Sequence, residues 1–183
     1  MMDGTSQGRG NIDIRPFQLD DAEQVYQAVE ESRGAVAPWM PDLGAVPSVE
    51  AVSAWITATM TARAAGHTFH CAIVDSPTDR FLGGCGLTHL HATHRFANLS
   101  YWVRSSQVRR GVATTATRLL AAWGFEHLNL HRIEIVVALA NTASLRVAQK
   151  AGAYREGVLR NRIWVHDRSH NAVMLSLIPQ DVP

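Results

Sequence analysis

The sequence predicts a mixed α/β fold, because strand-like and helix-like segments alternate along most of its 183 residues. Apolar residues alternate with period two in several short runs, which is typical of strands, and recur at helical spacing in others. The β-branched run within 131–139 suits a central strand buried on both faces. With 46% hydrophobic residues, a chain of this length forms one domain that buries roughly 70% of its unfolded surface.

The first half of the chain reads as strand, helix, loop, helix and hairpin. A short strand lies around Pro16, and Asp20 and Asp21 can cap the helix that follows. A proline-rich loop leads to Ser48 and an amphipathic helix that runs to about Met60. Two runs of strand-forming residues, separated by a polar turn, then predict a hairpin over 68–74 and 81–90.

The second half alternates more regularly between strands and helices. A strand over 96–103 is followed by a helix from Val112 to Trp123, and the strand 131–139 by a helix that begins near Asn141 and stops at Gly152. Closing strands are predicted at 158–165 and 172–178.

Composition and organisation exclude several classes of protein. We expect a flexible amino terminus over 1–11 and a single domain over 12–183, with no repeat and no linker. A net charge of +1 argues against direct nucleic-acid binding, and no apolar run approaches the ~20 residues of a membrane span. The start lacks the apolar core of a signal peptide, and Cys71 and Cys85 lack C-x-x-C spacing, so a reducing, cytoplasmic location is expected.

A strand, a basic turn with a glycine and a helix follow one another around Gly111. Free main-chain N–H groups at a helix start can hold a diphosphate, Gly111 permits close approach, and Arg109 and Arg110 add charge. No nucleotide-binding P-loop motif occurs, and Gly84-Cys85-Gly86 meets His89 where a dinucleotide motif needs its third glycine. The alternative is an ordinary solvated turn before a helix.

Several ordered blocks together resemble the GNAT superfamily, in its ribosomal-protein N-acetyltransferase branch. They are Ile14-Arg15-Pro16 with Asp20-Asp21-Ala22, Ala37-Pro38-Trp39-Met40-Pro41, Tyr101-Trp102-Val103, Arg110-Gly111-Val112-Ala113, Asn141-Thr142-Ala143-Ser144 and Lys150-Ala151-Gly152-Ala153. The resemblance, spanning about 12–177, implies a twisted mixed sheet of about six to seven strands with splayed parallel central strands, flanked by about four helices. It also implies acetyl-CoA as cosubstrate.

This chain departs from the family pattern at two places. Val108 and Arg109 stand where relatives usually have Arg or Gln and often a second glycine, and both positions contribute mainly main-chain amides. Asn171 stands where relatives commonly carry aspartate, so the sequence supports no acidic role there.

By resemblance, the amine attacks the thioester directly, which requires positioning, an oxyanion donor and a proton for the thiolate. The main-chain N–H near Val103 is the implied oxyanion donor. Asn141 caps a helix, contacts the pantetheine arm, or does both, and the Ser144 hydroxyl faces either the cap or the thiolate as general acid. The expected cofactor-binding residues are Arg104, Val108, Arg109, Arg110, Gly111, Val112, Ala113, Thr114, Asn141 and Ser144.

The general base has no glutamate candidate on the strand 96–103. His89, His91 and His94 can accept a proton near neutral pH, or they are simply histidines of a surface turn. With Cys85 they lack a recognised metal-ligand spacing, and no metal is expected.

On the acceptor side, the resemblance places Trp39 in a wall of the site. We expect Trp39 and Glu30 to bind substrate, with Glu31 and Asp42 as further acidic groups that favour a cation. The acceptor is a primary amine, on a protein N-terminus or on a small molecule such as a polyamine or aminoglycoside.

The alternative to an enzyme is a catalytically weak acyl-CoA-binding or interaction domain of the same fold. The absent glutamate favours it. Relatives are often dimers, so the resemblance implies a homodimer.

Overall fold

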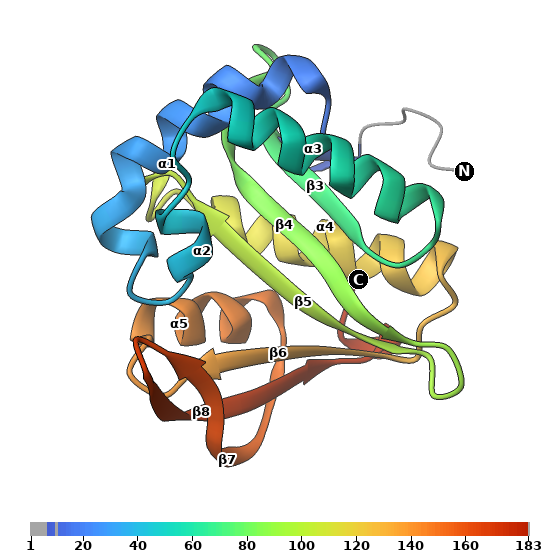
Figure 1. The fold of residues 1–183 in the computed structure, drawn as a ribbon. Coiled ribbons are helices and arrows are strands. Elements are labelled where there is room, and N and C mark those ends of the chain that lie inside the picture. Colours follow the sequence, from blue (N-terminus) through green and yellow to red (C-terminus); the bar gives the residue numbers. More distant parts are fainter. Residues whose placement is uncertain (1–6, 10, 183) are drawn as a thin grey trace.

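An eight-stranded mixed sheet organises the chain in the computed structural model, which describes residues 7–9 and 11–182 (Figure 1). The strand order is β1-β2-β3-β4-β5-β6-β8-β7, and among these described strands only β5 and β6 are parallel neighbours. The strands are β1 Gln7–Arg9, β2 Ile12–Pro16, β3 Phe69–Asp75, β4 Arg80–His91, β5 Phe96–Val103, β6 Arg132–Ala138, β7 Tyr154–Val165 and β8 Arg168–Leu177. The predicted mixed α/β class is confirmed.

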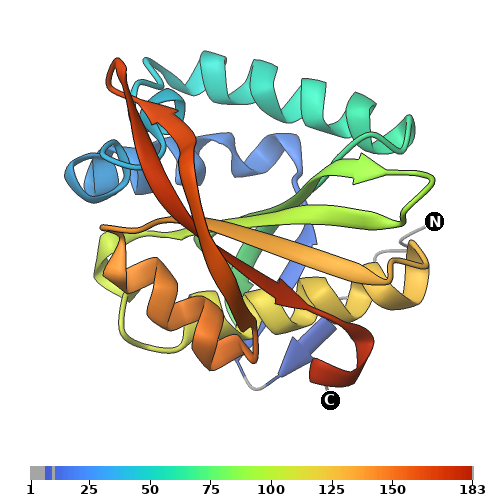
Figure 2. The same cartoon turned by 90° about the horizontal axis from the view of Figure 1, so that it is seen from below.

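Within the described residues, five α-helices cover the two faces of this sheet. They are α1 Ala22–Val36, the single turn α2 Pro41–Gly44, α3 Val49–Ala64, α4 Val112–His127 and α5 Thr142–Ala151. Figures 1 and 2 show α1 and α3 on one face and α4 and α5 on the other. Each face has its own apolar core, one centred on Val29, Ile56 and Phe81, the other on Leu87, Leu120 and Ile133.

The helix boundaries follow from local chemistry that the sequence displays. The Ser48 hydroxyl accepts a hydrogen bond from the Ala51 N–H at 3.3 Å, which caps α3. Helix α5 ends at Gly152, whose φ of +107° is the left-handed conformation that glycine adopts without strain. Helix α2 lies inside the segment predicted as loop, where Pro41 at its first turn suits so short a helix.

Strands β5 and β6 pair at one end only and then separate. Their register covers Phe96↔Arg132, Ala97↔Ile133 and Asn98↔Glu134 and stops there. Beyond it, β6 pairs with β8 on its other side as far as Ala138, while β5 stays paired with β4 as far as Val103. The predicted splayed parallel strands are therefore present.

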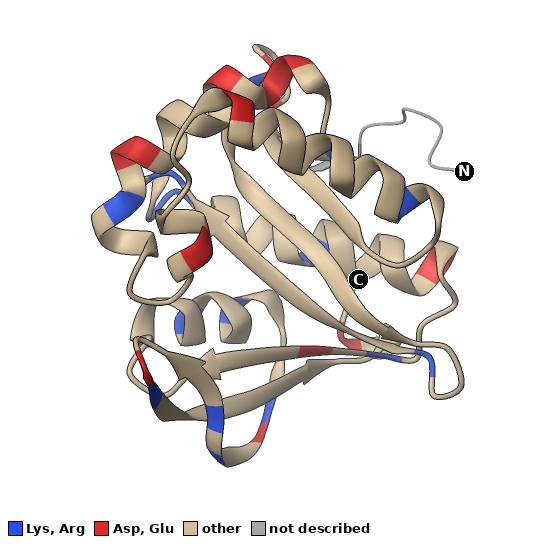
Figure 3. Cartoon of the chain, in the orientation of Figure 1, with Lys and Arg blue, Asp and Glu red and all other residues tan. Residues whose placement is uncertain are grey.

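The expected flexible segment 1–11 falls largely on residues outside those described, apart from the short pairing of β1 with β2. In the part of the chain that the structure describes, no helix is long and apolar enough to cross a membrane. Charged residues of both signs lie mainly on helices and outer strands, and β5 carries none (Figure 3).

Candidate active site

The turn before α4 presents main-chain donors at the open end of the splayed strands. Gly111 is the N-cap of α4 with φ +82°, and no side chain caps the helix. The first-turn N–H groups of Val112, Ala113 and Thr114 have no intrahelical partner by helix geometry. A Cβ on Gly111 would meet nothing within 4 Å, so φ, not crowding, requires the glycine. A diphosphate fits this turn, because both the donors and the dipole are uncapped.

The side chains of the turn fall into two groups. Val108, Arg109 and Arg110 are exposed, and neither arginine makes an ion pair within the described residues. Arg104 differs, because its guanidinium binds the Glu31 carboxylate at 2.7 Å and donates to the Phe81 carbonyl at 3.2 Å. The predicted role of Arg104 in cofactor binding therefore competes with a role in anchoring the loop to α1.

Glu31 completes this anchor. Its carboxylate also accepts the Ser106 N–H at 2.6 Å, and the hydrogen bond from Arg104 is the main cause that lowers the pKa of Glu31 to about 2. The carboxyl that the sequence suggested for a cationic substrate is thus already paired.

The Val103 N–H faces the gap between β5 and β6. The Arg104 N–H donates to the Leu82 carbonyl of β4 at 2.9 Å. Successive N–H groups of a strand point to opposite sides, so that of Val103 points away from β4. On that side β6 has already diverged, which leaves the donor beside the opening.

Ser144 and Tyr101 join the two walls of the gap. The Tyr101 hydroxyl on β5 lies 2.9 Å from the Ser144 carbonyl oxygen and 3.0 Å from its Oγ, on α5. The Ser144 N–H donates to Asn141 Oδ1 at 3.1 Å, so Asn141 caps α5 as predicted from its position. Burial raises the pKa of Tyr101 to about 12, which keeps the phenol protonated.

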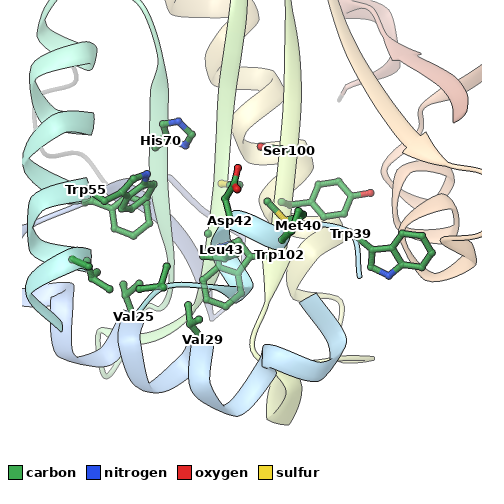
Figure 4. Close-up of a pocket in the computed structure, with 18 of the residues that line it drawn as sticks. Val25, Val29, Trp39, Met40, Asp42, Leu43, Trp55, His70, Ser100 and Trp102 are labelled. Atoms are coloured by element: carbon green, nitrogen blue, oxygen red, sulfur yellow. The ribbon is translucent and has the colours of Figure 1, made fainter. Parts of the chain in front are cut away.

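A cavity of about 490 Å³ lies between the sheet and the α1–α3 layer and reaches Tyr101 (Figure 4). Its walls are mostly apolar and aromatic, and among the lining residues Asp42, His70 and Ser100 carry the main polar atoms. The lining includes the aromatic residues Phe17, Trp39, Trp55, Tyr101, Trp102 and Trp164, and the substrate role of Trp39 stays a prediction.

His70 also lines the cavity, although no local signal in the sequence predicts its place there. It lies on β3 and packs edge-on against Trp55 with ring centroids 5.6 Å apart. Burial, with the nearby Arg63 charge, lowers its pKa, so the imidazole is neutral at physiological pH. Its signal in the sequence was Gly86, opposite His70 in the register, where a Cβ would lie 2.6 Å from His70 Nδ1.

Other predicted residues lie away from the cavity. Glu30 pairs with Arg33 on the exposed side of α1 and does not line the cavity. His91 and His94 stack with ring centroids 4.6 Å apart in the β4–β5 turn, which is the paired end of β5 and not the open one. Among the described residues, no three His, Cys, Asp or Glu side chains form a group that could hold a metal ion.

Comparison with known proteins identifies the family to which the sequence is similar. The model of the family described as "Acetyltransferase (GNAT) domain" matches residues 11–154. The Bacillus subtilis (strain 168) protein named "Probable N-acetyltransferase YjcK" is 27% identical over 172 residues, 93% of this chain and 95% of that protein.

Solved structures share the fold at lower identity. Mycobacterium smegmatis RimJ, in complex with CoA-disulfide, superposes with a TM-score of 0.87 at 24% identity, over 95% of this chain and 85% of that one. The ribosomal-protein-S5-alanine acetyltransferase of Vibrio fischeri gives 0.85 at 18% identity, over 98% and 99%. The resemblance to the GNAT superfamily is confirmed by the family model, and these structures share the fold.

Proposed function

The chain belongs to the GNAT acetyltransferase family, and from this premise we propose that it transfers acetyl to a primary amine by direct attack within a ternary complex. Acetyl-CoA is the cosubstrate, and the chain is an acetyl-CoA-dependent N-acetyltransferase. The observation that carries the proposal is the gap between β5 and β6, which opens beside the uncapped N-terminus of α4 and on the other side meets the cavity at Tyr101.

Main-chain groups bind and orient the cosubstrate in this proposal. The N–H groups from Gly111 to Thr114 hold the diphosphate, and Arg109 and Arg110 add charge-assisted contacts from solvent. The side chain of Asn141 caps α5 and thereby fixes the wall along which the pantetheine arm lies. The Val103 N–H donates to the carbonyl oxygen as negative charge develops there.

Ser144 supplies the proton to the departing thiolate. Its Oγ is 3.0 Å from the Tyr101 hydroxyl, and either oxygen can be the donor in that pair. The single Tyr101 O–H donates to the Ser144 carbonyl oxygen at 2.9 Å and, because the phenol remains protonated, it can shift to Ser144 Oγ as that hydroxyl gives its proton away. Tyr101 is therefore a positioning residue and Ser144 the general acid.

His70 takes a proton from the ammonium form of the acceptor, directly or through water, and the neutral amine then attacks the thioester carbonyl. A lowered pKa keeps its ring neutral and able to accept, and its place on the cavity wall puts it on the acceptor side of β5. The proposed base therefore comes from β3 and not from the β4–β5 turn.

Location and assembly are further parts of the proposal. Cys71 and Cys85 face each other in the register of β3 and β4, yet both are free and buried, which supports a reducing cytoplasm. Edge strand β7 exposes Tyr154 and Trp164, at 71% and 69%, which supports a homodimer that light scattering can test.

Free-thiol release from acetyl-CoA, measured with a panel of amines and N-terminal peptides, tests the proposed reaction. Turnover that requires the amine supports it. Tight acetyl-CoA binding with no turnover for any amine would instead support the acyl-CoA-binding domain.

A further inference from the structure

The acceptor cavity is built from rings that five separate segments contribute. Phe17 follows β2, Trp39 precedes α2, Trp55 lies on α3, Tyr101 and Trp102 on β5, and Trp164 on β7. Several rings contact one another, as Phe17 does with Trp55 at a centroid distance of 5.0 Å. Such walls offer apolar faces and edges and few hydrogen bonds.

One charged side chain faces this aromatic space. Asp42 on α2 is the single Asp, Glu, Lys or Arg of the lining, and within the described chain it makes no ion pair (Figure 4). The two acidic groups of α1 that lie closest to Asp42 in the sequence are paired elsewhere, Glu30 with Arg33 and Glu31 with Arg104. The cavity thus has a carboxylate for one ammonium group and none for a second.

We propose that the acceptor is a monoamine carried on a large apolar or aromatic group, whose ammonium form pairs with Asp42 while its apolar part lies among the rings. This inference rests on the proposed acetyl transfer. The same chemistry occurs in a free arylalkylamine and in a peptide whose first residue has a large apolar side chain, and the two are separate arms of the test.

The chemistry of burial favours this class over polyamines and aminoglycosides. Burying an apolar group among the rings removes its surface from water, which is favourable in proportion to its area. Asp42, Trp55 and Trp164 are exposed, so the first ammonium group keeps access to water, whereas a second one that lay deeper among the rings would lose water with no carboxylate beside it, which is unfavourable. A volume of about 490 Å³ is also ordinary for a site that encloses a small ligand.

The test compares acceptors at fixed acetyl-CoA by thiol release. We expect kcat/KM for phenylethylamine, or for a peptide amide beginning with Phe, to exceed that for spermidine by about 100-fold, and that for ethanolamine or a peptide beginning with Ser by about 10-fold or more. Equal or greater kcat/KM for spermidine would overturn the inference while leaving acetyl transfer intact. No turnover of any amine would remove both.

Variants assign the preference to this cavity. Asp42→Asn should raise KM for phenylethylamine about 10-fold, whereas the matched change Asp20→Asn, on an exposed carboxylate outside the lining, should not. Trp55→Ala should reduce the ratio of phenylethylamine to ethanolamine kcat/KM, and Met60→Ala, exposed on the same helix, should leave it unchanged. If neither Asp42→Asn nor Trp55→Ala alters these values, the acceptor does not bind in the cavity.

Discussion

The two sides of strand β5 differ in the groups that they present, which are main-chain donors on one side and side chains on the other. On the side of α4, the groups proposed to hold acetyl-CoA are main-chain N–H donors, positioned by a left-handed glycine and a helix start. On the opposite side, the acceptor cavity consists of side chains from helices, loops and strands that are distant in sequence. The first side depends on backbone conformation, so it tolerates varied side chains, while the second changes its specificity with each substitution.

This difference predicts that acetyl-CoA binding is most sensitive to a substitution that disturbs the backbone conformation of the turn before α4. Gly111→Val should weaken acetyl-CoA binding about 100-fold or more, because a β-branched residue resists a positive φ and the turn would rearrange. Calorimetric titration measures the affinity, and thermal unfolding checks the fold.

Gly66→Val provides the matched control. Gly66 also has a positive φ, of +74°, with nothing near its Cβ position, but it follows α3, away from the turn. Gly66→Val should lower the stability of the fold about as much as Gly111→Val does, and it should leave the affinity for acetyl-CoA unchanged. Equal loss of affinity in both variants would contradict the placement of the diphosphate.

Ser144→Ala should lower kcat by about 10- to 100-fold with little change in either KM, because a positioned proton donor acts on the leaving group. The exposed Thr142, in the same turn of α5, serves as control when changed to Ala. A Ser144→Ala enzyme with wild-type kcat would show that water protonates the thiolate.

The pH dependence of kcat/KM tests whether His70 acts as the base on the acceptor side. Since the neutral ring accepts the proton and its pKa is below the ordinary value of about 6.5, wild-type kcat/KM should fall as pH falls through the folded pKa. His70→Gln should lower the plateau about 10-fold and remove that step.

The histidine also links folding to pH. A base with a depressed folded pKa binds more protons when unfolded, so its contribution to stability is present above the unfolded pKa and is lost as pH falls below it. His70→Gln should therefore flatten the acid side of the stability profile. If His89→Gln removes the kinetic step and His70→Gln does not, the base lies in the β4–β5 turn.

The smallest effect is expected at the anchor between the two sides. Glu31→Gln should lower the Tm by about 1–3 °C, because it weakens the contacts to Arg104 and Ser106. The contribution of Glu31 to folding stability is present above the unfolded pKa and is lost as pH falls toward its folded pKa of about 2. The difference in Tm between the wild type and the variant should therefore narrow in acid. The exposed Glu126→Gln is the control, and an equal shift there would contradict the anchor.

The same contrast explains what the sequence could predict. Strand and helix periods, the Ser48 and Asn141 caps and the stop at Gly152 are local signals, and they place β2 to β6 and the turn before α4 close to their observed bounds. Strands β7 and β8 begin at Tyr154 and Arg168, four residues before their predicted starts at 158 and 172. The predicted role of Trp39 in a wall also rested on a contiguous block, and the cavity includes it.

The acceptor side was less predictable because its chemistry depends on register across strands. His70 becomes part of the site only through Gly86 on β4, and Glu30 leaves it because its rotation on α1 brings it to Arg33. Neither fact has a local signature. Gly84 and Gly86 of β4 do not form a dinucleotide-binding motif and instead make room for side chains. Gly86 makes room for His70, and a Cβ on Gly84 would lie 2.8 Å from Trp102 Nε1.

A crystal structure with coenzyme A and a slow acceptor analogue tests the central claim most directly. We expect the diphosphate on the N–H groups of residues 111–114, the sulfur between β5 and β6 near Val103 and Ser144, and the acceptor in the aromatic cavity. Coenzyme A bound elsewhere, or β5 and β6 paired along their full length, would contradict the account.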